Sequence, residues 1–329
     1  MGKTTVTLND IREAAERIRP YIRRTPLLHE ETMDKILGCE VYLKPEMLQV
    51  TGAFKMRGAI NKIFSLTEEE RKKGIICSSS GNHGKACALA GKMTGTRIIV
   101  VLPDDCPTAK IEGIKKLGGE VILGPRVYKP RWEMVRQEVE KHGYTVVHGY
   151  EDYGVMAGQG TLTLEILQDL PETDTIVVPV GGGGLIAGVA TAAKEINPRI
   201  KVVGVQAKAS DGYVKSREAG QRVEVECFPS LADGLGCRAP GENPYPIIEK
   251  YVDEFVAVEE DDIAKAVKLV AEEAKLVAEP SSCVGIAAVL GGQLKVKPDE
   301  RVCFILTSGN WDIDLIGKIL KGEHVDGRV

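Results

Sequence analysis

Residues 97–124, with the sequence RIIVVLPDDCPTAKIEGIKKLGGEVILG, contain two short apolar runs on either side of a helical pattern. The runs at 97–102 and 120–124 each predict a buried strand. The segment 108–117 between them predicts a helix that ends at Gly118-Gly119. A strand–helix–strand unit of this kind is typical of a parallel sheet whose two faces are covered by helices.

The same alternation continues along most of the chain. It predicts further strands at 74–77, 144–148, 175–180, 201–206, 254–258 and 301–307, and helices at 85–93, 131–142, 184–196, 259–275 and 283–291. The expected fold class is α/β, with two domains whose parallel or mostly parallel sheets are covered by helices. We expect residues 74–148 to form a small domain, and residues 1–73 and 149–329 to form a larger one.

Composition excludes several classes of protein. The 329 residues are 43% hydrophobic and 27% charged, with a net charge of −4, which is ordinary for a globular chain and gives no reason to expect a nucleic-acid partner. The longest apolar runs are far shorter than the roughly 20 residues of a membrane helix. None of the eight cysteines forms a C-x-x-C pair, so neither a zinc knuckle nor a thioredoxin-type motif is expected. We predict a cytoplasmic protein with free thiols and no membrane partner.

A strand at 176–180 is followed directly by four glycines, Gly181, Gly182, Gly183 and Gly184, and then by a helix. Backbone N–H groups at such a helix start bind anions, so we expect a phosphate here. The alternative is a tight turn that needs positive φ, for which one glycine would suffice. A dinucleotide-binding loop is disfavoured, because the next strand ends at Gln206 without the acidic residue that contacts the ribose.

Two further strand ends carry polar residues. After residue 77 comes Ser78-Ser79-Ser80-Gly81-Asn82-His83-Gly84, which predicts a second anion site, sized for a carboxylate, although helix capping by a serine is the simpler alternative. After residue 306 comes Thr307-Ser308-Gly309-Asn310, which fits a site or a plain turn equally well.

Lys55 stands among small and apolar residues, in Gly52-Ala53-Phe54-Lys55-Met56-Arg57-Gly58-Ala59. Most lysines in such positions lie on the surface. A desolvated lysine, however, has a lowered pKa and can act as a nucleophile, a Schiff-base former and a proton carrier.

Taken in order, the segments 52–59, 79–83, 157–161, 181–184 and 307–310 resemble those of the threonine/serine dehydratase and serine racemase family. These are fold type II enzymes of the tryptophan-synthase-β type that use pyridoxal 5′-phosphate (PLP). The resemblance runs from about residue 8 to residue 320. Family members usually have serine before Phe-Lys, where this chain has Ala53.

The resemblance implies roles for individual residues. Lys55 would carry PLP as the internal aldimine and act as the general base, and Thr307 would face the pyridine nitrogen. A neutral hydroxyl there makes the ring a weaker electron sink than an aspartate would, which favours prompt β-elimination over transamination. The other cofactor contacts implied are Phe54, Asn82, Gly181, Gly182, Gly183, Gly184, Leu185 and Glu279. The substrate carboxylate would be held in the smaller domain by Ser79, Ser80, Asn82 and His83.

The expected reaction is the conversion of L-threonine or L-serine to a 2-oxo acid and ammonia. Serine racemisation is an alternative, since the family's racemases place a hydroxyl where Ser80 stands, opposite the lysine, as a second acid/base. That hydroxyl could equally bind substrate or cap the helix. 3-Hydroxyaspartate and phenylserine share the reacting atoms, and a β-replacement synthase or a phosphometabolite-binding protein without catalysis would use the same glycine loop.

The resemblance also bears on metals and assembly. Racemases of the family bind a divalent metal through a glutamate and an aspartate, and here the matching positions read Gln206 and Gly212. No metal is therefore expected. Family members are commonly dimers, and we expect this chain to form a homodimer or homotetramer.

Overall fold

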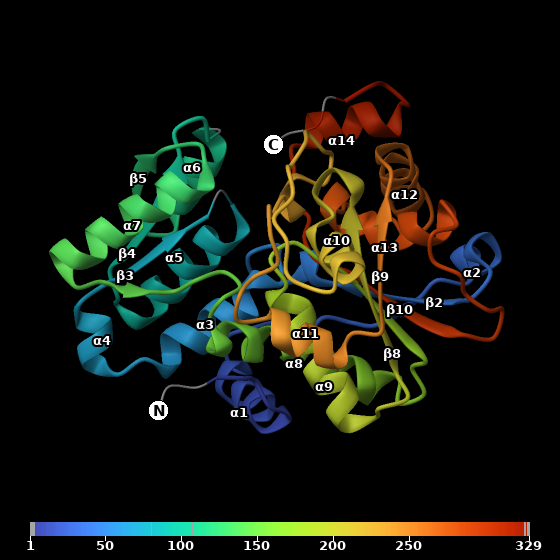
Figure 1. Cartoon of the computed structure of the whole chain (residues 1–329), viewed down its shortest axis with the longest axis horizontal. Helices are drawn as coiled ribbons and strands as arrows, with labels where there is room; N and C mark the ends of the chain where they lie inside the picture. The colour runs from blue at the N-terminus through green and yellow to red at the C-terminus, as the bar shows by residue number, and fades with distance from the viewer. Residues whose placement is uncertain (1–3, 80, 107, 326, 328–329) are drawn as a thin grey trace.

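The computed structural model describes residues 4–79, 81–106, 108–325 and 327, and it shows two lobes, each built around its own sheet (Figure 1). The larger lobe has a six-stranded sheet in which only the pair β1–β2 is antiparallel. Its strands, in spatial order, are β1 (Leu28–His29), β2 (Glu40–Pro45), β10 (Arg301–Leu306), β7 (Thr175–Pro179), β8 (Lys201–Ala207) and β9 (Glu254–Val258).

The smaller lobe has a four-stranded sheet whose strand pairs are all parallel. Its strands, in spatial order, are β5 (Glu120–Gly124), β4 (Ile98–Pro103), β3 (Ile75–Ser78) and β6 (Thr145–Val146). The predicted fold class is confirmed, because both sheets are mostly parallel and lie between helices.

Side chains on the strands of the larger sheet alternate between two cores. Ile176 and Val178 of β7 pack into one core, and Val177 packs into the other. This alternation follows from the period of two in a strand and buries both faces of the sheet. The first core is covered by α1 (Leu8–Ile18), α8 (Tyr153–Asp169), α9 (Gly184–Ile196) and α11 (Tyr245–Tyr251). The second is covered by α2 (Glu31–Leu37), α12 (Glu260–Glu272), α13 (Pro280–Leu290) and α14 (Ile313–Leu320), and α10 (Gly212–Ala219) follows β8.

The smaller sheet is covered in the same way. Its first face packs on α3 (Lys55–Ser65), α5 (Asn82–Thr94) and α6 (Thr108–Lys116). Its second face packs on α7 (Tyr128–His142), and the short helix α4 (Glu68–Lys72) precedes β3. Helix α3 lies between the two lobes in Figure 1, and it also contacts α8 of the larger lobe.

Element boundaries differ from the prediction in a few places. Helix α7 begins at Tyr128 rather than at 131, and α13 begins at Pro280 rather than at 283. Proline is tolerated in the first turn of a helix, where its missing N–H would have no partner. Helix α12 ends at Glu272, three residues early, and Lys275 beyond it has a left-handed φ of 56°. The assigned strand β6 covers only Thr145–Val146 of the predicted 144–148.

Three buried charges and one partly buried charge fix the start of α3. The Arg57 guanidinium, fully buried, donates from Nε to Glu46 Oε2 at 2.7 Å and from Nη1 to Glu165 Oε1 at 2.7 Å. Lys44 Nζ, also fully buried, donates to Glu165 Oε2 at 2.6 Å. Two cations and two carboxylates balance, and breaking a buried pair costs about 3–5 kcal/mol. The network therefore holds the turn of α3 that carries Lys55.

None of the helices within the described ranges combines the length and the apolarity that crossing a membrane requires.

Helices α8 and α9 approach each other closely through glycines. A Cβ added to Gly188 would lie 2.2 Å from Met156 O and 2.7 Å from Gly160 N. Both atoms belong to backbone, so neither can yield without moving a helix. This close contact fixes the position of α9, and of the loop before it, relative to α8.

Substitution of Gly188 by alanine should therefore destabilise the protein by about 1–3 kcal/mol through overpacking. Gly317 of α14 is the matched control, since nothing lies within 4 Å of its added Cβ. Gly317→Ala should be neutral or stabilising by up to about 1 kcal/mol, because alanine favours a helix interior. Urea unfolding followed by circular dichroism measures both; equal midpoints for the two variants would contradict the close approach of α8 and α9.

Candidate active site

A cavity of about 270 Å³ lies between the two lobes, where β3, β7 and β10 end. Carboxyl ends of parallel strands are the usual place for ligands in such sheets, because the following helices direct their N-termini there. The lining includes Lys55, Asn82, Thr307 and the tetraglycine loop, residues 181–184. Motifs that lie far apart in the sequence thus meet in one cavity.

Lys55 is the first residue of α3, and its side chain points into this cavity. Its Nζ donates to the Gly149 carbonyl at 3.0 Å and lies 4.9 Å from the centre of the Phe54 ring. Burial lowers the pKa of the Lys55 ammonium to about 8, and the neighbouring thiols of Cys237 and Cys87 only partly oppose this. No carboxylate among the described residues pairs with it within 4.0 Å. Roughly a tenth of the amine is therefore neutral at pH 7, against less than about a thousandth for an ordinary lysine.

The tetraglycine loop has no room for side chains. Gly183 has a left-handed φ of 99°, and a Cβ there would lie 2.1 Å from the Tyr213 hydroxyl. A Cβ on Gly182 would meet the Tyr150 ring at 2.5 Å. The loop leads into α9, whose first-turn N–H groups have no intrahelical acceptor and lie at the positive end of the helix dipole. This cradle of backbone donors fits a phosphate group.

The serine-rich segment provides the opposite wall, in the smaller lobe. Ser79 and Asn82 line the cavity at the start of α5, so a second helix N-terminus faces it. Ser80, the expected second acid/base, lies outside the described residues. Donors from Ser79, Asn82 and the first turn of α5 suit a carboxylate.

A chain of hydrogen bonds connects the two walls. Asn82 Nδ2 donates to Glu279 Oε1 at 3.1 Å, and the backbone N–H of Asn310 donates to the same oxygen at 2.9 Å. Asn310 Nδ2 in turn donates to Asn82 Oδ1 at 2.8 Å. Burial raises the pKa of the Glu279 carboxyl. Glu279 therefore acts here as a fixed acceptor that orients Asn82.

His83 lines the cavity as a neutral ring. Burial, followed by the charge of Lys55, lowers its pKa to about 4. Its Nε2 donates to the Val147 carbonyl at 3.0 Å. A neutral ring held by the backbone cannot supply a positive charge to a carboxylate, so His83 contributes packing and position.

Thr307 directly follows β10, and its hydroxyl lies 2.9 Å from the Ser282 hydroxyl. Both side chains are buried, and neither is ionisable at neutral pH. The cavity thus has a neutral hydroxyl at this strand end, as the sequence predicts. Phe54 and Leu185 also line it.

Several lining residues were not predicted from the sequence: Tyr128, Arg131, Trp132, His148, Tyr150 and Cys237. Tyr128 and Tyr150 share a hydroxyl–hydroxyl contact of 2.8 Å, and Trp132 stacks on His148 with centroids 4.5 Å apart. These side chains come from the first turns of α7 and from loops. No spacing in the sequence marks them, because only the packing of the lobes brings them together.

Arg131 is the unusual member of this group. Its Nε donates to Ser78 Oγ at 3.1 Å, and its Nη1 donates to the carbonyls of Pro125 and Arg126 at 3.1 and 2.7 Å. Burial lowers the pKa of its guanidinium. It has no carboxylate partner within 4.0 Å in the described part of the chain, where its neighbour Arg126 pairs with Asp105.

Comparisons with known proteins agree with this geometry. Residues 18–308 match the family model described as pyridoxal-phosphate dependent enzyme. The L-threonine ammonia-lyase of Thermotoga maritima is 43% identical over 324 residues, which are 98% of this chain and 80% of that protein.

Solved structures are similar over almost the whole chain. Serine racemase from Dictyostelium discoideum is 40% identical with a TM-score of 0.88, and the match covers 93% of this chain and 99% of that one. A pyridoxal 5′-phosphate-dependent aspartate racemase is 32% identical with a TM-score of 0.90, covering 96% and 99%. The extent of the family match and the buried lysine facing a glycine cradle lead to one conclusion: the chain belongs to the family of pyridoxal-phosphate-dependent enzymes.

Proposed function

We propose that this enzyme is a dehydratase (ammonia-lyase) that converts L-threonine, L-serine or both to a 2-oxo acid and ammonia. The observation that carries the proposal is the position of the Lys55 amine, deprotonated in part near neutral pH, in one cavity with the tetraglycine loop. Identity of 43% to an L-threonine ammonia-lyase supports the same reaction. Bound PLP supplies an electron-withdrawing ring that acidifies the α-hydrogen of an attached amino acid.

Two groups of residues would bind the two negatively charged groups of cofactor and substrate. Tetraglycine N–H groups and the dipole of α9 would bind the cofactor phosphate, while Ser79, Asn82 and the dipole of α5 would bind the substrate carboxylate. The two anions are then held on opposite lobes. Phe54 and Leu185 would pack on the cofactor, and Asn82 and Glu279 would orient it.

Proton transfer falls to Lys55. Its Nζ, once free and neutral, takes the α-proton from the substrate as general base. The low pKa matters because an ordinary lysine is almost fully protonated at pH 7. Thr307 would offer the ring nitrogen of bound PLP a neutral hydroxyl, which would favour prompt loss of the β-hydroxyl.

Gln206 supports a dehydratase without a metal at the racemase position. Its amide oxygen accepts from the N–H groups of Tyr213 and Val214, and its nitrogen donates to the Ser210 and Val180 carbonyls. The Gln206 side chain thus holds the loop after β8 through its own hydrogen bonds. Racemisation through Ser80 stays the alternative, and chiral analysis of the remaining substrate tests it.

The domain division at residues 74–148 also remains a proposal, as does assembly into a homodimer or homotetramer. A cytoplasmic location suits eight cysteines that are all free.

The first test is Lys55→Ala. This variant should lose the visible absorbance of the lysine-bound cofactor and should form 2-oxo acid from L-threonine at least about 1,000-fold more slowly. Lys85→Ala is the control, since that lysine lines the cavity without contacting Gly149. A Lys55→Ala protein that keeps both properties would overturn the assignment.

The pKa of Lys55 gives a pH prediction for the apoprotein. Only the neutral amine attacks an aldehyde, so the rate of PLP attachment should rise about 10-fold per pH unit below 8 and level off above it. An ordinary lysine, such as Nα-acetyl-lysine in the same buffers, keeps rising toward pH 10. Stopped-flow absorbance between pH 6 and 10 measures this, and a rate that still climbs steeply at pH 9.5 would contradict the lowered pKa.

Arg131 favours a second candidate, the dehydration of 3-hydroxyaspartate, because its guanidinium lines the cavity without a carboxylate partner in the described structure. Arg131→Gln should then reduce kcat/KM for 3-hydroxyaspartate by about 10- to 100-fold and spare that for L-threonine. Arg136→Gln, on the exposed side of α7, is the control. No turnover of 3-hydroxyaspartate by the wild type would exclude this candidate.

A further inference from the structure

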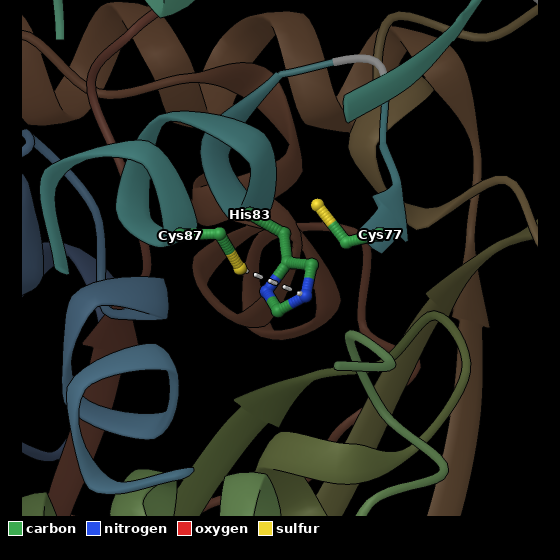
Figure 2. Close-up of side chains that lie close together, drawn as sticks. All are labelled: Cys77, His83 and Cys87. Carbon is green, nitrogen blue, oxygen red and sulfur yellow. Dashed lines mark hydrogen bonds between the residues drawn. The ribbon is translucent and has the colours of Figure 1, made fainter. Parts of the chain in front are cut away.

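Behind the wall of the cavity, Cys77, His83 and Cys87 form a buried group, which we name the Cys-His-Cys cluster (Figure 2). One potential ligand atom from each residue lies within 4.8 Å of the other two. Both cysteines are 0% exposed and His83 is 3% exposed. Figure 2 shows the His83 ring between Cys87 and Cys77, with a dashed line from the Cys87 sulfur to a ring nitrogen.

Local structure explains why they meet. Cys77 lies in β3, and His83 and Cys87 are four residues apart on α5, which places both on one face of the helix. That face packs against the smaller sheet. A strand residue and an i, i+4 helical pair are thus held by rigid elements rather than by loops.

The cluster has an unused hydrogen-bonding group. Nδ1 of His83 is buried without a partner in the described part of the chain, although the ring's Nε2 donates to Val147 O. An unpaired buried nitrogen costs free energy unless something else occupies it. Two thiols beside it make a cation the natural occupant.

We propose that the Cys-His-Cys cluster binds one soft or borderline divalent cation, Zn²⁺ or Cd²⁺, through two thiolates and the His83 ring. His83 would bind the metal through Nδ1, because Nε2 donates to the Val147 carbonyl. One potential ligand atom from each residue lies within 4.8 Å of the other two, and two ligands on one tetrahedral zinc are separated by roughly 3.5 Å. The three side chains would therefore move closer together when the metal binds.

Charge selects the cation. Binding follows M²⁺ + 2 RSH → M(SR)₂ + 2 H⁺, so the dication and two thiolates form a neutral unit suited to a dry site. The cluster contains no carboxylate, which disfavours Mg²⁺ and Ca²⁺. Because two protons are released, affinity should increase with pH.

The position links the cluster to the catalytic lysine. A Cβ built on Gly149 would lie 3.4 Å from the His83 ring and 3.7 Å from Lys55 Nζ, so ring and amine flank the same glycine. Metal binding would fix the ring beside the amine. The site is distinct from the proposed reaction and does not depend on it.

The test uses the PLP-loaded enzyme with Cys227 and Cys237 replaced by serine, since these two cysteines are not fully buried and could bind metal themselves. Cd²⁺ is added by equilibrium dialysis, and bound metal per chain is measured together with the ultraviolet thiolate-to-cadmium absorbance. We expect one Cd²⁺ per chain. Cys77→Ala and Cys87→Ala should each weaken binding by at least about 100-fold.

Cys283→Ala is the matched control, because this cysteine is equally buried but lies in the larger lobe. It should leave Cd²⁺ binding unchanged. Melting curves identify any variant that fails to fold, in which case Cys77→Ser and Cys87→Ser replace it. No Cd²⁺ bound by the parent protein, or binding that neither Cys77 nor Cys87 substitution alters, would overturn the proposal.

Discussion

The burial of a lysine amine without a carboxylate is the constraint on which the site depends. Lys44 and Lys55 differ in their partners. Lys44 Nζ donates to Glu165 at 2.6 Å and stays part of a balanced charge network. Lys55 Nζ instead donates to the Gly149 carbonyl at 3.0 Å and pairs with no carboxylate in the described part of the chain. Burial lowers the pKa of both amines, but Glu165 opposes this at Lys44, whereas no described carboxylate pairs with Lys55.

The same electrostatic field serves both the lysine and its ligands. Helices α3, α5 and α9 all begin at the cavity, with Lys55, Asn82 and Gly184 as their first residues. Positive helix ends disfavour an ammonium and favour anions. Burial in this cavity lowers the pKa of the Lys55 ammonium, and the three helix N-termini add a positive potential that suits anions. This positive potential comes from the backbone dipoles of the three helices and not from charged side chains.

The sequence predicts those parts of the site that leave a local pattern. Four consecutive glycines suit neither a helix nor a strand, so the phosphate cradle follows from the residues alone. Lys55 does not, since burial depends on the lobes that close over it, and only a family resemblance identified it. Strand β2 was not predicted from the sequence, because one of its buried positions is a lysine, Lys44. Arg131 reaches the cavity through the packing of α7, which no short-range pattern records.

Helix α5 connects the catalytic cavity to the Cys-His-Cys cluster. Its first turn presents Asn82 to the cavity, and its next turn presents Cys87 to β3, while His83 touches both environments. Asn82 is in turn bonded to Glu279 of the larger lobe. Any ligand that fixes His83 therefore acts on the same helical turn that carries Asn82. Because the residues of one helical turn move together, the position of His83 on α5 constrains the position of Asn82.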